Sequence, residues 1–147
     1  MMSALELANY IVVKCVADDE PITNLQLQKI LYYIQGRHLS IFNVPAFIDE
    51  IEAWKFGPVV PKVYYAFCHY GAMPIIRIGN NTDFDEDVDR DLVDRTIEEK
   101  RNMDPWDLVT ETHKEGGAWE TIFNGGVGYR RYIPKDLIRR DFADNGY

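Results

Sequence analysis

Three histidines, His38, His69 and His113, are the first residues to consider for catalysis, because imidazole titrates near neutral pH and can act as an acid or a base. None of them lies in an H-E-x-x-H motif or in a cysteine and histidine pattern with the spacing of a zinc site. Glu111 and Glu115 flank His113 only as chain neighbours. We therefore predict no catalytic and no metal-binding residue, and a hydrolase centred on His113 remains an alternative hypothesis.

Two further patterns could bind ions, and both are incomplete. The glycine-rich residues 125–128 lack the Lys-Ser/Thr pair that follows a phosphate-binding loop, so they are predicted to form a surface loop. The acidic residues 83–87 lack the glycine and the glutamate that a calcium-binding loop needs at its sixth and twelfth positions. We interpret them as a solvated acidic linker, and we predict no cofactor.

Large aromatic side chains are the chemistry that this sequence does offer. It contains 9 Tyr, 7 Phe and 3 Trp, or 13% of the residues. Tyr and Trp combine a wide apolar face with a polar tip, which suits half-buried core positions and protein interfaces alike. Composition leaves both roles open for several of them: Tyr32, Tyr33, Trp54, Tyr64 and Tyr65.

Two capping boxes predict where the first helices begin. Ser3 with Glu6, and Thr23 with Gln26, have the spacing at which two side chains satisfy the free backbone donors of a helix start. The following residues repeat at helical spacing and predict two buried stripes: Leu5, Ala8, Val12, Cys15 and Val16 in the first helix, and Leu27, Ile30, Leu31, Ile34 and Ile41 in the second. Gly36 within the second helix predicts a close approach of another helix.

The rest of the chain alternates short extended segments with helices. Residues 51–56 are predicted to be extended before Gly57-Pro58 breaks the chain, and residues 74–84 are predicted to form a second strand and a turn that could pair with them. Further helices are predicted from Pro61 to a cap at Gly71, over residues 87–101, from Pro105, over residues 118–123 and from Pro134. The prediction is a mostly α fold over residues 1–147, a single compact domain of about five to seven helices with a short two-stranded β-hairpin.

Cysteine use and hydropathy indicate a cytoplasmic protein. Cys15 and Cys68 lie far apart among apolar neighbours, so both are predicted to be reduced thiols in the core. The N-terminus lacks a basic segment followed by a clean apolar stretch, and no segment approaches the roughly 20 apolar residues that cross a bilayer. We therefore expect neither secretion nor membrane insertion.

The charge is acidic and uneven. The chain carries a net charge of −8, and residues 81–120 hold 14 Asp and Glu against 5 Lys and Arg. Such a surface repels phosphate backbones, so nucleic-acid binding is not expected unless a local basic patch supports it. One cluster near the C-terminus is basic and is interpreted as a solvated helix face: Arg130, Arg131, Lys135, Arg139 and Arg140.

Two blocks of sequence resemble a known family. The segments LQKILYYIQG at residues 27–36 and IEAWKFGPVV at residues 51–60, followed by Val63-Tyr64, resemble the Panacea domain of SocA-like antitoxins, which include phage-associated GepA-like proteins. THKEGGAW at residues 112–119 and Ile133-Pro134 are similar to later parts of the same pattern. The resemblance covers nearly the whole chain.

The resemblance implies a helical antitoxin that neutralises a cognate toxin protein by direct contact. It also implies that the motif residues are mainly structural. Physical reasoning gives several of them a role: Gly57-Pro58 is expected to form a fixed turn and Trp54 to anchor the extended segment on the second helix. His113 with Trp119 is expected to pin the C-terminal helices to that helix. Thirteen motif residues are carried over in this sense: Gln28, Lys29, Tyr32, Tyr33, Gln35, Gly36, Glu52, Trp54, Gly57, Pro58, Tyr64, His113 and Trp119. The residues that touch the toxin are not implied.

The leading hypothesis is thus an antitoxin whose acidic surface steers a basic partner and whose aromatic side chains hold it. A DNA-binding autoregulator that uses the basic C-terminus is a further alternative, although no recognition helix is evident. Homodimer formation, and handover of the toxin to a protease, are left open by the sequence.

Overall fold

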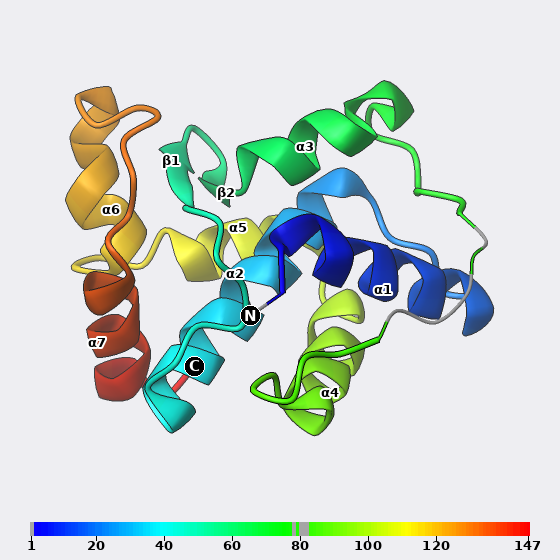
Figure 1. The fold of residues 1–147 in the computed structure, drawn as a ribbon. Helices are drawn as coiled ribbons and strands as arrows, with labels where there is room; N and C mark the ends of the chain where they lie inside the picture. Colours follow the sequence, from blue (N-terminus) through cyan, green and yellow to red (C-terminus); the bar gives the residue numbers. More distant parts are fainter. Residues whose placement is uncertain (1, 78, 80–82) are drawn as a thin grey trace.

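The computed structural model describes residues 2–77, 79 and 83–147, and these fold as a mostly helical protein with one hairpin (Figure 1). The prediction of a mostly α fold with a two-stranded hairpin is confirmed. The described residues form seven α-helices, two strands and two short 3₁₀ helices: α1 (Ala4–Ala17), α2 (Asn24–Phe42), β1 (Glu52–Trp54), β2 (Gly57–Val59), α3 (Pro61–Phe67), η1 (Cys68–Tyr70), α4 (Arg90–Arg101), α5 (Pro105–Thr112), α6 (Ala118–Phe123), η2 (Asn124–Gly126) and α7 (Lys135–Asn145).

Helix α2 is the centre of the structure, and α1, α3, α4, α5, α7 and β2 all contact it (Figure 1). Both predicted capping boxes form. The Ser3 side chain accepts from the backbone N–H of Glu6, and the Thr23 side chain accepts from that of Gln26, while each N3 side chain returns a bond to its cap. The two longest helices therefore begin where their side chains satisfy the free backbone donors.

The predicted stripes are confirmed at most positions and wrong at their ends. Leu5 is 37% exposed and Ile41 is 63% exposed. The buried face of α1 begins with Ala4, Leu7 and Ala8. Leu5 lies one position after Ala4 and therefore points away from this face. In the last turns of α2 the buried positions are His38 and Leu39, so Ile41 lies outside the inward-facing stripe.

Gly36 allows α7 to pack closely against α2, as predicted. A Cβ atom added at Gly36 would overlap three atoms of the Phe142 ring on α7. That ring is 2% exposed and makes edge contacts with Tyr32 and Tyr33, at centroid distances of 5.4 and 5.7 Å. The α2–α7 contact is therefore built around an aromatic ring seated on a glycine.

The hairpin pairs differently from the prediction. Strands β1 and β2 are antiparallel, with Glu52 opposite Val59 and Trp54 opposite Gly57, so Gly57-Pro58 starts the second strand and is not the turn itself. The turn is Lys55-Phe56, and the positive φ of 122° at Gly57 explains why glycine follows it.

The second strand predicted at residues 74–84 is wrong for the described residues of that segment, which form no strand there. The buried Ile75 instead donates its backbone N–H to the carbonyl of Ile22 at 2.8 Å, so this segment is tied to the loop between α1 and α2. Ile78 and most of the turn predicted after it lie outside the described residues.

Two other predictions need correction. Helix α4 begins at Arg90 and not at Asp87, because the Asp89 side chain caps it by accepting from the backbone of Leu92. Both cysteines are free thiols as expected, but only Cys15 is buried. Cys68 is exposed because Val63 and Phe67 occupy the buried face of α3.

Helix α4, which follows the acidic segment 83–89, packs one face into the core against α2. Its inward residues are Leu92, Val93, Thr96, Ile97 and Lys100. Some of its outward carboxylates make intramolecular contacts. Glu99 pairs with Arg37 at 2.9 Å, and Asp94 accepts a hydrogen bond from the Tyr10 hydroxyl at 2.5 Å. Within the described residues, the helices are too short or too polar to traverse a lipid bilayer.

Candidate functional site

A concave surface rich in aromatic rings lies over the hairpin turn and α3. It encloses a volume of about 700 Å³. We call it the aromatic groove, and its rings are Trp54, Phe56, Tyr64, Tyr65, Trp106 and Tyr129. Four of these large side chains are about half exposed, at 47% for Phe56, 52% for Tyr65, 58% for Trp106 and 50% for Tyr129.

Five parts of the chain bring these rings together. Trp54 ends β1 and Phe56 lies in the hairpin turn, while the other rings come from α3, the first turn of α5 and the loop after η2. The indole of Trp54 contacts Tyr64 at a centroid distance of 5.0 Å and Tyr129 at 6.4 Å. Phe56 meets Trp106 edge to face at 5.6 Å. The rings thus support one another in the edge-on geometry that aromatic pairs prefer.

The loop after η2 is fixed to the hairpin by backbone hydrogen bonds. The N–H of Arg130 donates to the carbonyl of Ala53 at 2.7 Å, and the N–H of Ala53 donates to the carbonyl of Arg131 at 2.9 Å. A further bond joins Ile133 to Ile51 at 2.8 Å. This segment therefore covers the outer edge of β1 and holds the C-terminal wall of the groove in place.

Lys29 lies beneath the groove and is 0% exposed. Its ammonium group donates to the backbone carbonyl of Phe56, at the hairpin turn. Burial lowers the pKa of Lys29 to about 7, because charging an amine away from water is unfavourable. Within the described residues no carboxylate lies at ion-pair distance from Lys29, so no acid compensates its charge when the amine is protonated.

His113 is packed between aromatic and backbone groups. Its ring stacks on Trp119 at a centroid distance of 3.6 Å and an interplanar angle of 6°. The Trp119 indole N–H donates to the carbonyl of Trp54 at 2.8 Å, which ties α6 to the hairpin. Burial and the nearby Lys29 lower the pKa of His113.

The surroundings of His113 do not resemble a hydrolytic site. Its Nε2 is buried, and it has no hydrogen-bond partner among the residues that the structure places. Glu111 is engaged elsewhere, since it accepts from the Tyr33 hydroxyl and pairs with Lys100, and Glu115 is exposed. Among the described residues, neither neighbouring carboxylate is placed to orient His113 as a general base.

The other two histidines are also occupied structurally. His38 is buried, with one ring nitrogen 2.7 Å from the carbonyl of Val44 and the other accepting from the backbone N–H of Asp89 at 3.2 Å. His69 lies against the ring of Tyr70 at a centroid distance of 4.4 Å. The three imidazoles lie on different elements and form no shared cluster in the described structure.

Comparison with known proteins identifies the family. The SocA-like antitoxin Panacea domain matches residues 27–120, which is more than half of the chain. Antitoxin SocA of Caulobacter vibrioides is 35% identical over 146 residues, covering 88% of this chain and 77% of that protein. The chain belongs to the SocA-like antitoxin family. No solved structure shows a significant match.

The SocA-like motif residues fall into two groups around α2, and the first group supports the hairpin. Gln28 accepts from the backbone N–H of Val60 at 2.9 Å and donates to Asn24 at 3.0 Å. Glu52 accepts from the Trp54 indole at 3.0 Å. With Lys29, Gly57, Pro58, Tyr64, His113 and Trp119, these residues surround the hairpin and the floor of the groove.

The second group of motif residues lies further along α2. Gln35 is buried, accepts from the backbone N–H groups of Ala46 and Phe47, and donates to the carbonyl of Phe47 at 3.0 Å. Tyr32, Tyr33 and Gly36 contact Phe142 on α7. The mainly structural role of both groups remains a prediction.

The motif comparison missed part of the groove. Tyr129 and Arg130 lie outside the motif blocks, while Phe56 belongs to the predicted extended segment and Trp106 to the helix predicted from Pro105. The nearest signal in the sequence was the concentration of aromatic residues, which predicts an interface without locating it. Tyr129 and Arg130 reach the groove because the chain returns to the hairpin after η2.

The basic cluster does not form a free patch. Lys135 pairs with Glu50 at 3.1 Å, and Asp136 pairs with both Arg139 and Arg140, at 2.6 and 3.0 Å. Arg130 lies over Trp54 in the groove. Neighbouring acids therefore offset much of the positive charge that this cluster could present to DNA. This weakens the hypothesis of a DNA-binding autoregulator.

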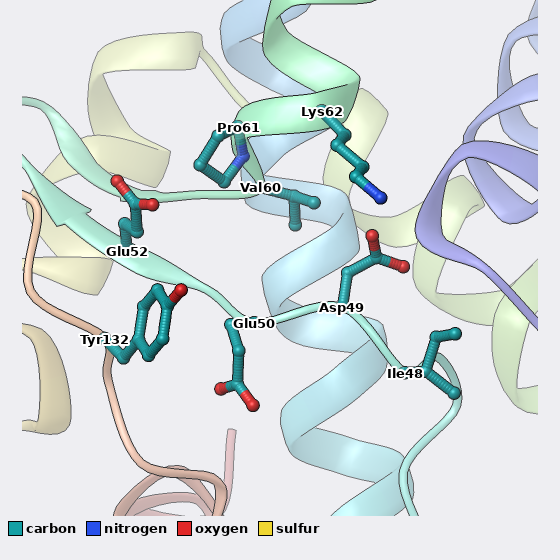
Figure 2. Close-up of a pocket in the computed structure, with 8 residues that line it drawn as sticks. All are labelled: Ile48, Asp49, Glu50, Glu52, Val60, Pro61, Lys62 and Tyr132. Carbon is teal, nitrogen blue, oxygen red and sulfur yellow. The ribbon is translucent and has the colours of Figure 1, made fainter.

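A second concave site, of about 410 Å³, is acidic (Figure 2). Figure 2 shows Lys62 beside Asp49, and Tyr132 beside Glu50 and Glu52. Asp49 accepts from the backbone N–H of Ala4 at 2.7 Å, and the two glutamates bind Lys135 and the Trp54 indole. Each carboxylate therefore has a structural partner, and the described residues contain no cluster able to hold a metal ion.

Proposed function

We propose that this protein is an antitoxin that neutralises a cognate toxin by direct complex formation in the cytoplasm, without a catalytic step of its own. The observation that carries the proposal is the aromatic groove in a chain of the SocA-like family. Tyr, Trp and Arg dominate the binding energy of protein interfaces, and here they are gathered at one concave surface. The name of the Caulobacter vibrioides relative, antitoxin SocA, supports the same function.

The groove has the properties of a prepared interface. Its rings are half exposed, yet they are held by edge contacts and by the hydrogen-bonded loop after η2. Pre-positioned aromatic side chains lose little conformational entropy when a partner binds. We therefore expect the toxin to bury Tyr65, Trp106 and Tyr129 in the complex.

Co-expression tests this function directly. The chain is expressed with the product of each adjacent open reading frame, and growth rescue and co-purification are scored. We expect one neighbour to be toxic alone, harmless with this chain, and present in a stable complex. If none of the neighbours is neutralised or co-purified, the proposed function is wrong.

Variants locate the contact surface within that assay. Tyr65→Ala combined with Trp106→Ala should abolish growth rescue while the helical circular dichroism spectrum is retained. Tyr132→Ala is the matched control, because Tyr132 is 61% exposed but does not line the groove. Rescue by the double variant and loss of rescue by Tyr132→Ala would place the interface elsewhere.

The same complex answers the two questions that the sequence left open. Multi-angle light scattering of the purified complex distinguishes a 1:1 assembly from one built on a homodimer. The lifetime of the toxin after protein synthesis is stopped distinguishes sequestration from handover to a protease. We expect sequestration to suffice, so that neutralisation persists when the toxin is long-lived.

A further inference from the structure

The groove has a charge opposite to that of the chain as a whole. Its basic lining residues are Lys55, Arg130 and the buried Lys29, whose pKa of about 7 leaves it only partly charged at neutral pH, and no Asp or Glu is among its lining residues. Yet the chain has 24 acidic and 16 basic residues and a net charge of −8. A concave surface with low-dielectric aromatic walls concentrates the field of these cations. The groove is therefore a local site of positive potential on an acidic protein.

Among the described residues, no carboxylate lies at ion-pair distance from the cations of the groove, whereas several basic residues elsewhere are paired with acids. Seven basic residues outside it form ion pairs at 2.6–3.6 Å: Lys14, Arg37, Lys100, Arg101, Lys135, Arg139 and Arg140. Lys55 instead lies over the Phe56 ring at 5.5 Å. Arg130 lies over Trp54 at 4.6 Å and donates to the Tyr65 hydroxyl at 2.9 Å. Both are thus held by aromatic groups, which leaves their charge uncompensated among the described residues.

The backbone at Arg130 adds an independent observation. Its φ is 67°, in the left-handed region that a non-glycine residue adopts only at a cost. Its N–H is bonded to Ala53, and this bond keeps the residue in that conformation above Trp54. Glycine would fit this backbone with less strain. The arginine side chain is therefore placed in the groove at the expense of local backbone energy.

We infer that the aromatic groove binds an acidic segment of the partner protein, whose carboxylates pair with Arg130 and Lys55 while its apolar side chains pack among Trp54, Tyr65 and Trp106. This inference rests on the proposed function, because the partner is the toxin. An arginine can bind a carboxylate through two parallel hydrogen bonds, and its aromatic support pre-orients the guanidinium for this contact. The toxin as a whole can still be basic and be attracted by the segment before α4, because residues 83–89 hold five Asp and Glu and no Lys or Arg.

A single-stranded nucleic acid is the other polymer that aromatic rings and arginine can hold. The charges disfavour it, because a polyphosphate would also meet the acidic residues 81–120, where 14 acidic side chains stand against 5 basic ones. A short peptide segment with a few carboxylates avoids that repulsion. The peptide is therefore the occupant to which we commit, and nucleic-acid binding is an outcome of the test.

The direct probe is a pair of fluorescein-labelled peptides, DWEDLEWG and its amide analogue NWQNLQWG, measured by fluorescence anisotropy. We expect the carboxylate peptide to bind the wild-type chain at least ten-fold more tightly than the amide peptide. Lys55→Glu with Arg130→Glu should remove this difference. The control is Arg77→Glu with Arg95→Glu, which changes the net charge equally at exposed positions outside the groove. Equal binding of the two peptides, or equal effects of the two double variants, would overturn the inference.

Arg130→Gly separates binding from folding. Because glycine relieves the left-handed backbone, the urea midpoint should be equal to or higher than that of the wild type, while the carboxylate peptide binds at least ten-fold more weakly. A purely structural arginine would show the opposite, with lower stability and unchanged binding. If a labelled 12-nucleotide oligo(U) bound more tightly than the peptide and lost binding in the Lys55→Glu and Arg130→Glu variant, the groove would be a nucleic-acid site.

The toxin complex distinguishes failure of this inference from failure of the function. If Lys55→Glu with Arg130→Glu still co-purifies with the toxin at unchanged affinity, the antitoxin function stands and the groove assignment falls. If the wild-type chain binds no neighbouring gene product, the function itself falls, and the peptide pair still decides whether the groove selects carboxylates.

Discussion

Gly36→Ala is predicted to destabilise the protein even though alanine is the better helix former. In an exposed helix interior, this change would raise the free energy of unfolding by about 1 kcal/mol. At position 36 the new methyl group would overlap three atoms of the Phe142 ring. The two effects have opposite signs, so the measured sign decides whether the packing of α7 on α2 controls this position.

The surroundings of Phe142 set the size of the loss. The ring is 2% exposed and lies 5.4 Å from Tyr32 and 4.8 Å from Tyr147. It has little room to retreat, and overpacking in such a site costs about 2–3 kcal/mol. Subtracting the gain of about 1 kcal/mol in helix propensity leaves a net loss of about 1–2 kcal/mol. At about 2–4 °C per kcal/mol for a chain of this size, the melting temperature should fall by roughly 2–8 °C.

Urea denaturation followed by far-ultraviolet circular dichroism measures this loss. Phe142→Leu provides the matched background, because the smaller side chain vacates the space that the new methyl group needs. In that background Gly36→Ala should cost at least 1 kcal/mol less than in the wild type, which is a coupling energy typical of contacting residues. A more stable Gly36→Ala protein, or equal effects in the two backgrounds, would show that the glycine is not required by the Phe142 ring.

Three further changes test buried polar groups. Lys29→Met should be more stable than the wild type at neutral pH. The pKa of Lys29 in the folded protein is about 7, below its ordinary 10.5, so between these values the unfolded chain binds the extra proton. The wild type therefore gains stability as pH rises, and the difference in the free energy of unfolding between the variant and the wild type should shrink by up to about 1.4 kcal/mol per pH unit from pH 7 to 10. Gln35→Leu leaves buried backbone groups of residues 46–47 unbonded and should cost about 2–4 kcal/mol in urea titrations. Trp119→Phe keeps the ring stack but removes the indole N–H bond to Trp54, and should cost about 1–2 kcal/mol in the same assay.

Each of these has an outcome that contradicts it. A difference between Lys29→Met and the wild type that stays constant from pH 7 to 10 would mean that Lys29 keeps an ordinary pKa. A Gln35→Leu protein as stable as the wild type would mean that water replaces the lost amide. Full stability of Trp119→Phe would show that the bond to Trp54 does not hold α6 on the hairpin.

The boundaries of several elements could be predicted because their causes are local. The capping boxes at Ser3 and Thr23 act within four residues, and Pro61 and Pro105 fix the backbone at the first helical position. The buried face of a helix is less local, because it depends on what covers the helix. Ile41 therefore fitted the apolar pattern but is exposed.

Pairing between distant segments could not be predicted from such signals. Residues 51–59 form their own hairpin, and the segment around Arg130 bonds to Ala53 from more than 70 positions away. No local pattern encodes that return of the chain. The same holds for the aromatic groove, whose rings come from five separate parts of the sequence and whose exposure depends on how those parts pack.

The structure assigns different tasks to its polar groups according to whether they are already satisfied. Gln28, Gln35 and the Trp119 indole have their hydrogen bonds completed inside the protein, so they have little left to offer a partner. Lys55 and Arg130 face aromatic rings and keep their charge available. Substitutions in the first set should therefore change the free energy of unfolding, and those in the second set should change affinity for the partner. Measuring the free energy of unfolding and the affinity for the partner for one variant of each set tests this distinction. A variant that changed both quantities equally would contradict it.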